Sequence, residues 1–508
     1  MEEIYFGCLM STLTIKKKNH AYITVDGEPS TLNELSDFFT FYVPGYKFMP
    51  AYRNKMWDGK IRLFNTQTRE LYAGLYDYIE EFAAVDGRDY KIELEHDNYY
   101  GYPAIKQDID MGFINDLTLT SKGNKIEVRD YQRAAIEQGL SRKGSLLLSP
   151  TASGKSLIIY CMARYYLENY NKKILVVVPT TSLVQQMFSD FADYSQYDEN
   201  FGEDMMHRIY SGRPKFADQE RIIISTWQSI YKMPGKWFEQ FGMVVGDEAH
   251  NFKAKSLTSI LGKMRDAEYR IGTTGTLDGT QTHQLVLEGL FGRTFKVTTT
   301  KDLMEKGSLA ELDIKVLLLK YSDELCKLMN KSKYQEEVDF IVKHEARNKF
   351  ITNLSLDQDG NTLILFQFVE KHGKPLHTMI TDKAHKRRKI FYVSGETDVD
   401  SREQIRSITE NEKNAIIVAS MGTFSTGINI RNLHNIIFAS PSKSQIRILQ
   451  SIGRGLRKSD DGRPTTLYDI ADDLHWKKNK NYTLLHAAER IKIYSREKFN
   501  YNIYEIDI

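Results

Sequence analysis

The feature that most restricts the fold of this chain is an apolar run at 146–148 followed by a loop that ends in Gly154-Lys155-Ser156. A strand at 145–149, this loop and an apolar helix at 155–169 together predict a phosphate-binding loop. Gly154 leaves backbone amides free to approach phosphate oxygens, Lys155 supplies positive charge, and the Ser156 hydroxyl can bind magnesium. The rest of the expected nucleotide-binding loop is Thr151, Ala152 and Ser153.

A pair of acids, Asp247-Glu248, follows a second apolar run at 243–245. A strand that ends in two adjacent carboxylates suits a magnesium-nucleotide site. We expect Asp247 to hold the metal together with Ser156, and Glu248 to orient and deprotonate the attacking water. A solvated turn is the competing interpretation of two adjacent acids.

Strands and helices alternate over most of the chain, which predicts an α/β fold with parallel sheets. We divide the chain into a small α+β module at 1–120, a first α/β domain at 121–310 and a second at 311–508. A helix cap is expected at Thr31, with Glu34 three residues later. Expected strands lie at 174–178, 222–225, 243–246, 270–273, 314–320, 362–367, 390–393, 415–419, 435–439 and 466–470, and expected helices at 182–193, 255–264, 331–355, 400–410, 443–452 and 482–498.

Composition sets broad limits on the function. The formal net charge of +2 over 508 residues neither requires nor excludes nucleic acid. The three cysteines are far apart, which argues against a zinc or iron–sulfur site and favours a reducing cytoplasm. The N-terminus lacks the basic start of a signal peptide, and no apolar stretch approaches the ~20 residues of a membrane span. We therefore expect a cytoplasmic protein with no membrane partner.

Two arginines, Arg454 and Arg457, share one helical face in the segment 450–457. They suit a pair of fingers that reach a phosphate from another domain. A basic surface turn is the competing interpretation.

The ordered motifs resemble those of superfamily 2 helicases over most of residues 121–475. That resemblance implies two RecA-like domains in tandem that use ATP and Mg²⁺. It covers the segments 129–132, 149–156, 179–183, 225–229, 247–250, 272–276, 363–368, 420–430 and 450–457.

The resemblance assigns further roles by motif. Gln132 would read adenine and Arg129 would stack on it, while Gly427 and Gln450 would contact the nucleotide. Thr180 and Thr226 lie in motifs that grip the nucleic-acid backbone. His250, Thr274 and Thr276 would couple hydrolysis to movement. Asn429 stands where many members carry aspartate.

The segment 46–63 resembles the N-terminal module of the UvsW family, the recombination helicases of tailed phages. It implies ATP-driven remodelling of branched DNA: fork regression, Holliday-junction migration, unwinding of DNA–RNA hybrids such as R-loops, and strand annealing. The DNA contacts expected here are Arg53, Lys55, Trp57 and Lys60. Basic and aromatic residues alternate as in nucleic-acid sites, although a core role for the aromatics is equally open. Residues 1–125 hold 14 Lys/Arg and 19 Asp/Glu, so binding would need one concentrated face.

The densest basic cluster is Lys386-Arg387-Arg388-Lys389, which precedes an expected strand. Lys386, Arg387 and Arg388 are candidate phosphate contacts, and a solvated basic loop is the alternative.

The hypothesis that joins these observations is an ATP-dependent DNA helicase or translocase acting in recombination, repair and replication. Expected partners are branched or duplex DNA and DNA–RNA hybrids, with the protein a monomer in the host cytoplasm if phage-encoded. The alternatives are an RNA helicase and an ATP-gated strand-annealing or binding protein.

Overall fold

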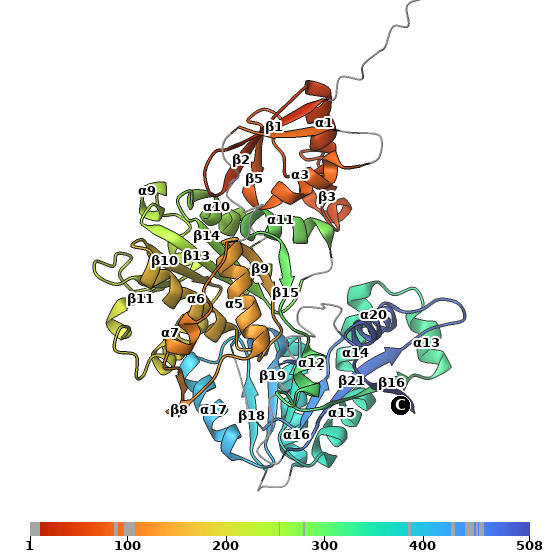
Figure 1. Cartoon of the computed structure of the whole chain (residues 1–508). Helices are drawn as coiled ribbons and strands as arrows, with labels where there is room; N and C mark the ends of the chain where they lie inside the picture. The colour runs from red at the N-terminus through yellow and green to blue at the C-terminus, as the bar shows by residue number, and fades with distance from the viewer. Residues whose placement is uncertain are drawn as a thin grey trace, which may run out of the picture. The chain divides into compact units, whose positions relative to one another are not determined.

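The computed structural model describes residues 11–85, 90–95, 107–252, 255–277, 280–384, 388–427, 432–441, 452–453, 456 and 462–508 (Figure 1). Two compact units divide the chain. One comprises residues 1–149 and 154–297, and the other comprises residues 150–153 and 298–508. In the described residues, no helix is both long enough and apolar enough to cross a membrane.

The N-terminal module is a small α+β unit built on a four-stranded sheet in the order β5-β2-β1-β6. Strand β1 pairs antiparallel with β2 and parallel with β6. Its alternating residues Leu13 and Ile15, with Ile23 and Val25 of β2, are fully buried, as expected for a sheet with one face on a core. The elements are β1 (Thr12–Lys17), β2 (Tyr22–Asp26), α1 (Pro29–Phe38), β3 (Thr40–Tyr42), η1 (Tyr46–Phe48), α2 (Pro50–Arg53), β4 (Lys60–Arg62), β5 (Glu70–Tyr72), η2 (Ala73–Leu75), α3 (Tyr76–Ala83) and β6 (Lys91–Leu94).

The expected helix cap at Thr31 is wrong. Helix α1 begins two residues earlier at Pro29, and Thr31 is buried inside it. Proline suits the first helical position because its fixed φ matches the helix and its missing N–H has no partner to lose there.

The first sheet domain has seven strands, all parallel, in the order β11-β12-β10-β13-β14-β9-β15. The central strands β10 and β13 are buried almost throughout, as a sheet covered on both faces requires. Its strands are β9 (Gly144–Leu148), β10 (Lys173–Val178), β11 (Met206–Ile209), β12 (Ile222–Thr226), β13 (Phe241–Asp247), β14 (Tyr269–Thr274) and β15 (Thr294–Lys296). Its helices are α5 (Asp130–Arg142), α6 (Lys155–Asn169), α7 (Thr181–Tyr194), α8 (Trp227–Ile230), α9 (Gly235–Phe238), α10 (Lys255–Lys263) and α11 (Gln281–Phe291), with the short turns η3 (Glu203–Met205) and η4 (Ala249–Asn251). The connection from the N-terminal module carries α4 (Phe113–Asp116), β7 (Thr120–Ser121) and β8 (Asn124–Lys125).

The N-terminal module and the first sheet domain share one apolar core. The contact is close at Gly74, where a Cβ atom would lie 2.0 Å from the carbonyl oxygen of Glu288 in α11. The Tyr78 hydroxyl donates to Glu288 Oε2 at 2.5 Å, and the Arg293 guanidinium stacks over the Tyr78 ring at 3.7 Å. Helix α11 is therefore the element on which the module rests.

The second sheet domain repeats the architecture with seven parallel strands in the order β18-β19-β17-β20-β21-β16-β22. Both parallel sheets, together with the small module, confirm the predicted fold class. The strands are β16 (Leu312–Lys320), β17 (Thr362–Phe366), β18 (Ile390–Val393), β19 (Ile416–Ser420), β20 (Asn435–Phe438), β21 (Thr465–Asp473) and β22 (Tyr501–Asp507). The helices are α12 (Thr300–Glu305), α13 (Asp323–Met329), α14 (Tyr334–Lys343), α15 (Glu345–Asp357), η5 (Val369–Gly373), α16 (Lys374–Lys383), α17 (Val399–Asn411), α18 (Met421–Gly427) and α20 (Tyr482–Arg496).

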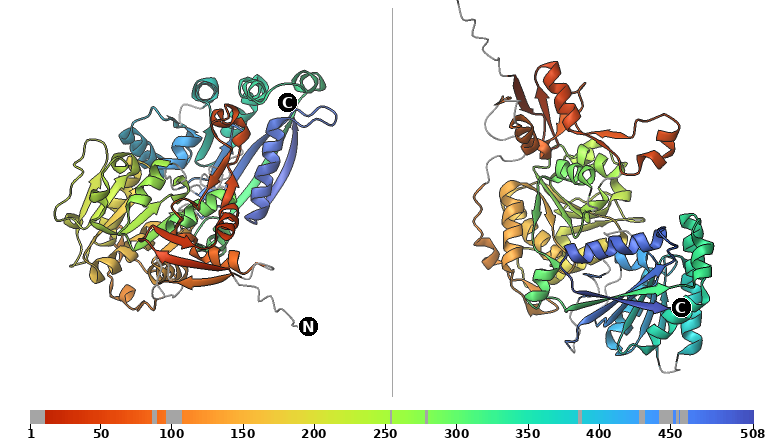
Figure 2. Two further views of the ribbon diagram at one scale, coloured as in Figure 1. Left: turned by 90° about the horizontal axis from the view of Figure 1, so that it is seen from above. Right: turned by 90° about the vertical axis from the view of Figure 1, so that its right-hand side faces the viewer.

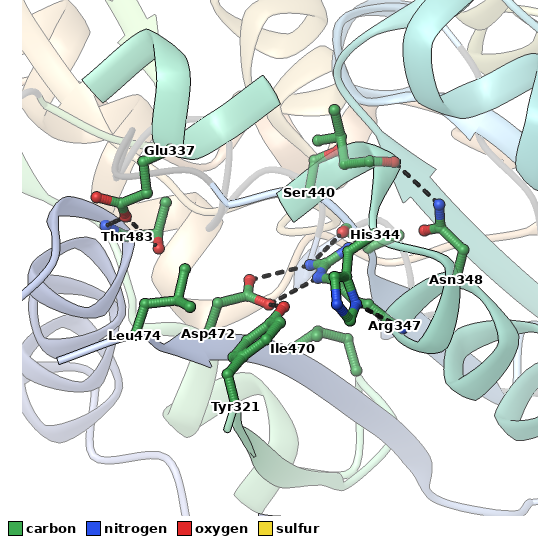
Figure 3. A network of polar contacts seen from close by, with 12 residues as sticks. Tyr321, Glu337, His344, Arg347, Asn348, Ser440, Ile470, Asp472, Leu474 and Thr483 are labelled. Carbon is green, nitrogen blue, oxygen red and sulfur yellow. Dashed lines mark hydrogen bonds and ion pairs between the residues drawn. The ribbon is translucent and has the colours of Figure 1, made fainter. Parts of the chain in front are cut away.

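The single helix expected at 331–355 is instead two helices, α14 and α15. His344 separates them with an extended backbone, and its ring accepts a hydrogen bond from the Arg347 N–H at 3.4 Å. This cap starts α15 in a new direction and turns the Arg347 side chain into the core of the domain, where it pairs with Asp472 (Figure 3).

Candidate nucleotide and nucleic-acid sites

The phosphate loop leaves the carboxyl end of β9, and helix α6 begins at Lys155. The Ser149 N–H donates to the Thr274 carbonyl at 2.8 Å, which fixes the loop against the end of β14. Gly154 has φ +81°, and a Cβ atom there would lie 2.3 Å from Gln132 Nε2. The positive φ favours glycine here, because residues with a side chain rarely adopt this conformation.

The backbone of the loop has the curvature that phosphate binding needs. Ala152 has φ +65°, in the left-handed region. The buried Ser153 hydroxyl donates to the Pro150 carbonyl at 2.7 Å and holds that turn. Lys155 Nζ lies 3.4 Å from the Ser149 carbonyl oxygen, so its ammonium group folds back over the loop. A curved loop of amides with one ammonium group is an anion cradle.

Gln132 lies against this loop, as the adenine-recognition assignment requires of it. It is buried, and its Oε1 accepts a hydrogen bond from the Arg129 N–H at 2.9 Å. Arg129 is exposed, and its guanidinium donates to the Tyr131 hydroxyl at 3.0 Å. The start of α5 therefore brings the Gln132 side chain beside Gly154.

The two acids at the end of β13 have different surroundings. Asp247 is buried and its Oδ1 accepts a hydrogen bond from the Thr273 hydroxyl at 2.7 Å. Burial raises the pKa of Asp247 above its ordinary value, the charge of Glu248 adds to the rise, and Lys155 opposes it. A cation bound beside Asp247 would favour the charged carboxylate and offset that burial.

Glu248 adopts a left-handed backbone conformation, with φ +50° and ψ +50°. Such a conformation is uncommon for a residue with a side chain, and it turns Glu248 away from the line of the strand. Its Oε2 atom is buried and accepts no hydrogen bond within the described residues. A buried carboxylate oxygen that accepts no hydrogen bond is suited to accept a proton from a bound water.

A magnesium ion fits the donor set here. Mg²⁺ prefers oxygen ligands and is commonly held by one or two protein groups with water and substrate phosphates completing its shell. Asp247 offers a carboxylate, and Ser156 offers a hydroxyl that shares a hydrogen bond of 2.8 Å with the Tyr194 hydroxyl. Among the described residues no group of three acidic, histidine or cysteine side chains gathers as a metal cage.

Three predicted coupling residues meet behind the acids. His250 Nδ1 lies 3.0 Å from the Thr274 hydroxyl and 3.4 Å from Glu248 Oε2. The Thr274 hydroxyl donates to the Thr276 carbonyl at 3.0 Å. His283 of α11 adds a contact that the sequence did not reveal, because its Nε2 lies 3.0 Å from the His250 carbonyl oxygen. The loops after β13 and β14 are thus joined through His250.

The two threonines assigned to the nucleic-acid backbone lie at neighbouring helix starts. Thr180 caps α7 and accepts a hydrogen bond from the Leu183 N–H at 3.3 Å, while Thr226 precedes α8 and bonds the Ser229 hydroxyl at 2.9 Å. Gln228 Nε2 donates to the Pro179 carbonyl at 3.3 Å and ties the two loops together. Both lie at the carboxyl edge of adjacent strands, where open α/β sheets place ligands.

The N-terminal candidates divide into surface and structural residues. Arg53 and Lys55 are exposed, and Lys60 is half-buried. Trp57 is half-buried, and its indole N–H donates to the Lys60 carbonyl at 2.8 Å. The Trp57 indole nitrogen therefore stabilises the backbone between Trp57 and Lys60.

Arg388 has a structural role rather than the expected role as a free phosphate contact. Its guanidinium donates to the carbonyls of Leu356 and Gln358, each at 2.9 Å, where α15 ends. Cationic side chains often bind the last carbonyls of a helix. One charge of the cluster at 386–389 is therefore bound to backbone carbonyls inside the domain.

Comparison with known proteins decides the family. The model described as "DNA helicase UvsW, N-terminal" matches residues 12–95, "Type III restriction enzyme, res subunit" matches 125–279, and "Helicase conserved C-terminal domain" matches 345–459. The "ATP-dependent DNA helicase uvsW" of Enterobacteria phage T4 is 38% identical over 95% of this chain and 97% of the relative.

The chain belongs to the UvsW family.

Solved structures agree with this UvsW assignment, and the resemblance inferred from the motifs is confirmed. "The crystal structure of T4 UvsW" covers 98% of this chain and 99% of its own, at 35% identity and a TM-score of 0.51. A fragment of a putative HsdR subunit of a type I restriction enzyme from Vibrio vulnificus covers 78% and 72%, at 16% identity and a TM-score of 0.57. The second match shows the shared fold alone.

Several residues of this UvsW-family chain that the sequence marked as candidates lie outside the described residues. They are Lys386, Arg387, Asn429, Gln450, Arg454 and Arg457, and most of the helix expected at 443–452 lies there too. Gly427 is the last residue of α18. Sequence reasoning missed Thr273, Tyr194 and His283, which contact the site. Thr273 and His283 had a usable signal, since one ends a predicted strand beside the acids and the other follows the 272–276 motif.

Proposed function

We propose that this UvsW-family chain is an ATP-dependent DNA helicase that remodels branched DNA. The observation that carries the proposal is Glu248 Oε2, a buried carboxylate oxygen without a hydrogen-bond partner in the described residues, next to Asp247 and the phosphate loop. The phage T4 relative, 38% identical along nearly its whole length, carries the name of an ATP-dependent DNA helicase.

The proposed hydrolysis uses the phosphate loop, the two acids at the end of β13 and the start of α5. The loop amides, Gly154 and Lys155 bind the β- and γ-phosphates, and Gln132 and Arg129 hold the base. Glu248 takes a proton from water as the water oxygen attacks the γ-phosphorus, and the bond to the β–γ bridging oxygen breaks to release ADP. Asp247 and Ser156 would hold Mg²⁺, which neutralises charge that develops on the phosphate oxygens.

The remaining nucleotide contacts stay predictions. Gln450 and Gly427 are assigned to nucleotide sensing, and Arg454 and Arg457 to stabilising the charge of the transferring γ-phosphoryl group. Arginine fingers of this kind are worth roughly 10³–10⁵ in rate in other phosphate-transferring enzymes.

The proposed polymer contact lies along the helix starts at Thr180 and Thr226. Backbone N–H groups at helix N-termini bind phosphate oxygens without reading bases, so a grip of this kind tolerates any sequence. Hydrolysis would reach this grip through His250 and Thr274. The finer proposals are a preference for forks, Holliday junctions and DNA–RNA hybrids, a monomeric protein, and action in the host cytoplasm, as befits a relative of a phage protein.

The test is steady-state ATP hydrolysis without polymer and with single-stranded DNA, duplex DNA, a four-way junction or RNA, at matched nucleotide concentration and low salt. We expect the strongest stimulation from DNA, with junctions converted to separated products. Stimulation by RNA alone would reassign the chain to RNA remodelling. ATP-independent annealing with no DNA-stimulated turnover would favour the strand-annealing alternative.

A further inference from the structure

An arm of the N-terminal module exposes large apolar side chains. We define the basic arm as residues 40–62, which comprise β3, η1, α2 and β4. Figure 2 shows this segment, in red, reaching out from the rest of the module. Phe48 is 76% exposed and Met56 is 81% exposed, and Tyr42 and Met49 are also exposed. Exposed apolar residues that gather in one segment indicate a binding surface.

The arm keeps its shape without Phe48, Met49 and Met56. The Tyr46 ring stacks on Tyr42 at 4.6 Å and meets Tyr52 edge-on at 4.7 Å. Gly59, with φ +81°, brings the backbone against the Tyr46 ring, where a Cβ atom would lie 2.3 Å from a ring carbon. With the Trp57 hydrogen bond to Lys60, these contacts make a small aromatic core of the arm's own. Phe48 and Met56 are outside that core and are free for another task.

The charge of the arm selects a polyanion as the partner. The arm carries Lys47, Arg53, Lys55, Lys60 and Arg62 against one acid, Asp58. Asp58 pairs with Arg62 at 2.5 Å, and Lys60 lies over the Tyr42 ring at 5.1 Å. The region 1–125 has five more acids than bases, so positive charge is concentrated on this arm. Cations flanking exposed apolar side chains are the composition of proteins that insert side chains between DNA bases.

The arm is rooted beside the coupling residues. The Thr282 hydroxyl of α11 donates to the Tyr42 carbonyl at 3.5 Å. The next residue, His283, contacts the His250 carbonyl oxygen at 3.0 Å. The base of the arm and the histidine of the Asp247–His250 motif are thus linked through two adjacent residues of one helix.

We propose that the basic arm is the strand-separating element of this protein. Phe48 and Met56 insert at the junction between duplex and single-stranded DNA and unstack its first base pair, while Lys47, Arg53 and Lys55 bind the flanking phosphates. The inference rests on the proposed function, because strand separation needs the ATP-driven movement described above.

The first test compares Phe48→Ala/Met56→Ala with the wild type on a forked duplex. The double variant should lower the rate of strand separation by about tenfold or more, the change that roughly 1.4 kcal/mol of lost unstacking energy produces. ATP hydrolysis stimulated by single-stranded DNA should stay within about twofold, because the phosphate contacts remain. Phe216→Ala is the matched control, since Phe216 is 72% exposed elsewhere in the same unit.

A second test measures base unstacking at the junction in the absence of ATP. A fork carries 2-aminopurine at its first base pair, and its fluorescence should rise when the wild-type protein binds, because unstacking relieves quenching. Phe48→Ala/Met56→Ala should abolish the rise at saturating protein, while Phe48→Leu/Met56→Leu should keep it.

Each contrary outcome has a distinct meaning. Unchanged strand separation and unchanged fluorescence in the Ala variant would overturn the proposal. A parallel loss of binding, hydrolysis and separation would also overturn it and make the arm a general DNA grip. In a third outcome, DNA does not stimulate hydrolysis by the wild-type protein, but binding still raises the fluorescence. That result would refute the proposed function and still support insertion of the two side chains.

Discussion

His250 Nδ1 lies 3.0 Å from the Thr274 hydroxyl, which joins the loop after β13 to the loop after β14. The same hydroxyl donates to the Thr276 carbonyl, and His283 holds the His250 backbone from α11. The Thr274 side chain therefore joins the loop that carries the two acids to the loop of the 272–276 motif.

Replacing Thr274 with valine should separate hydrolysis from movement. Valine keeps the volume and removes the hydroxyl, so Asp247, Glu248 and Lys155 keep their places while His250 loses its contact with the Thr274 hydroxyl. We expect DNA-stimulated hydrolysis within about threefold of wild type and fork unwinding lower by about tenfold, within the usual range of coupling energies. Both rates are measured on one fork. Thr381→Val, on the exposed face of α16, is the control, and equal loss of both activities would refute a coupling role.

Glu248→Gln should abolish turnover and spare nucleotide binding. The amide cannot accept the proton of water, and loss of a general base costs about 10²–10⁴ in rate. Asp247 and Lys155 remain, so affinity for a fluorescent ATP analogue should change little. Asp247→Asn is the contrasting variant, which should raise the Mg²⁺ concentration needed for binding. Full hydrolysis by Glu248→Gln would remove Glu248 from the chemistry.

The sequence predicted the phosphate loop and most of the parallel strands because apolar runs of five or six residues leave little choice of structure. It did not predict β22, whose partner β16 lies nearly two hundred residues away and whose own residues are mostly exposed. The sequence also could not predict that Arg347 is buried, because a charged residue in a helix is expected on the surface unless its partner is known. Arg347 and Asp472 are both fully buried, and only the folded chain brings them together.

This buried pair gives a prediction about stability (Figure 3). Arg347 Nε donates to Asp472 Oδ1 at 2.7 Å, a second guanidinium nitrogen donates to the Ala439 carbonyl, and the Tyr321 hydroxyl donates to the same carboxylate at 2.8 Å. Arg347→Met should destabilise the second sheet domain by about 3–5 kcal/mol, because Asp472 is left charged and buried.

The matched variant is Arg347→Met/Asp472→Leu, which removes both charges. It should recover much of the loss, since an apolar pair of similar volume replaces the ion pair. Urea unfolding of the two variants and the wild type measures the difference. If the double variant is no more stable than Arg347→Met, the unpaired charge of Asp472 is not the cause of the loss.

His372 predicts how stability depends on pH. Its ring is fully buried, its Nδ1 lies 2.9 Å from the Ser440 hydroxyl, and its Nε2 has no hydrogen-bond partner within the described residues. Burial, with a smaller effect from the charge of Arg347, lowers the pKa of His372 to about 3. The folded protein therefore keeps this ring neutral across the physiological range.

The direction of this pH dependence follows because the chain takes up a proton when it unfolds. The unfolded chain protonates this histidine below about pH 6.5, while the folded chain does so only near pH 3. Between these values the unfolded state binds more protons, so the free energy of unfolding falls as the pH falls. The contribution of His372 is complete above pH 6.5 and should decline by up to about 1.4 kcal/mol per pH unit below it.

The measurement is urea unfolding of the wild type and His372→Asn at several pH values from 7 to 5. Asparagine retains a polar atom toward Ser440 and does not titrate, and subtraction of the two curves removes the effects of all other groups. The wild type should lose stability relative to the variant as the pH falls through 6. Parallel curves over this range would mean that the His372 ring titrates alike in the folded and unfolded chains, so that its burial has no effect on its charge.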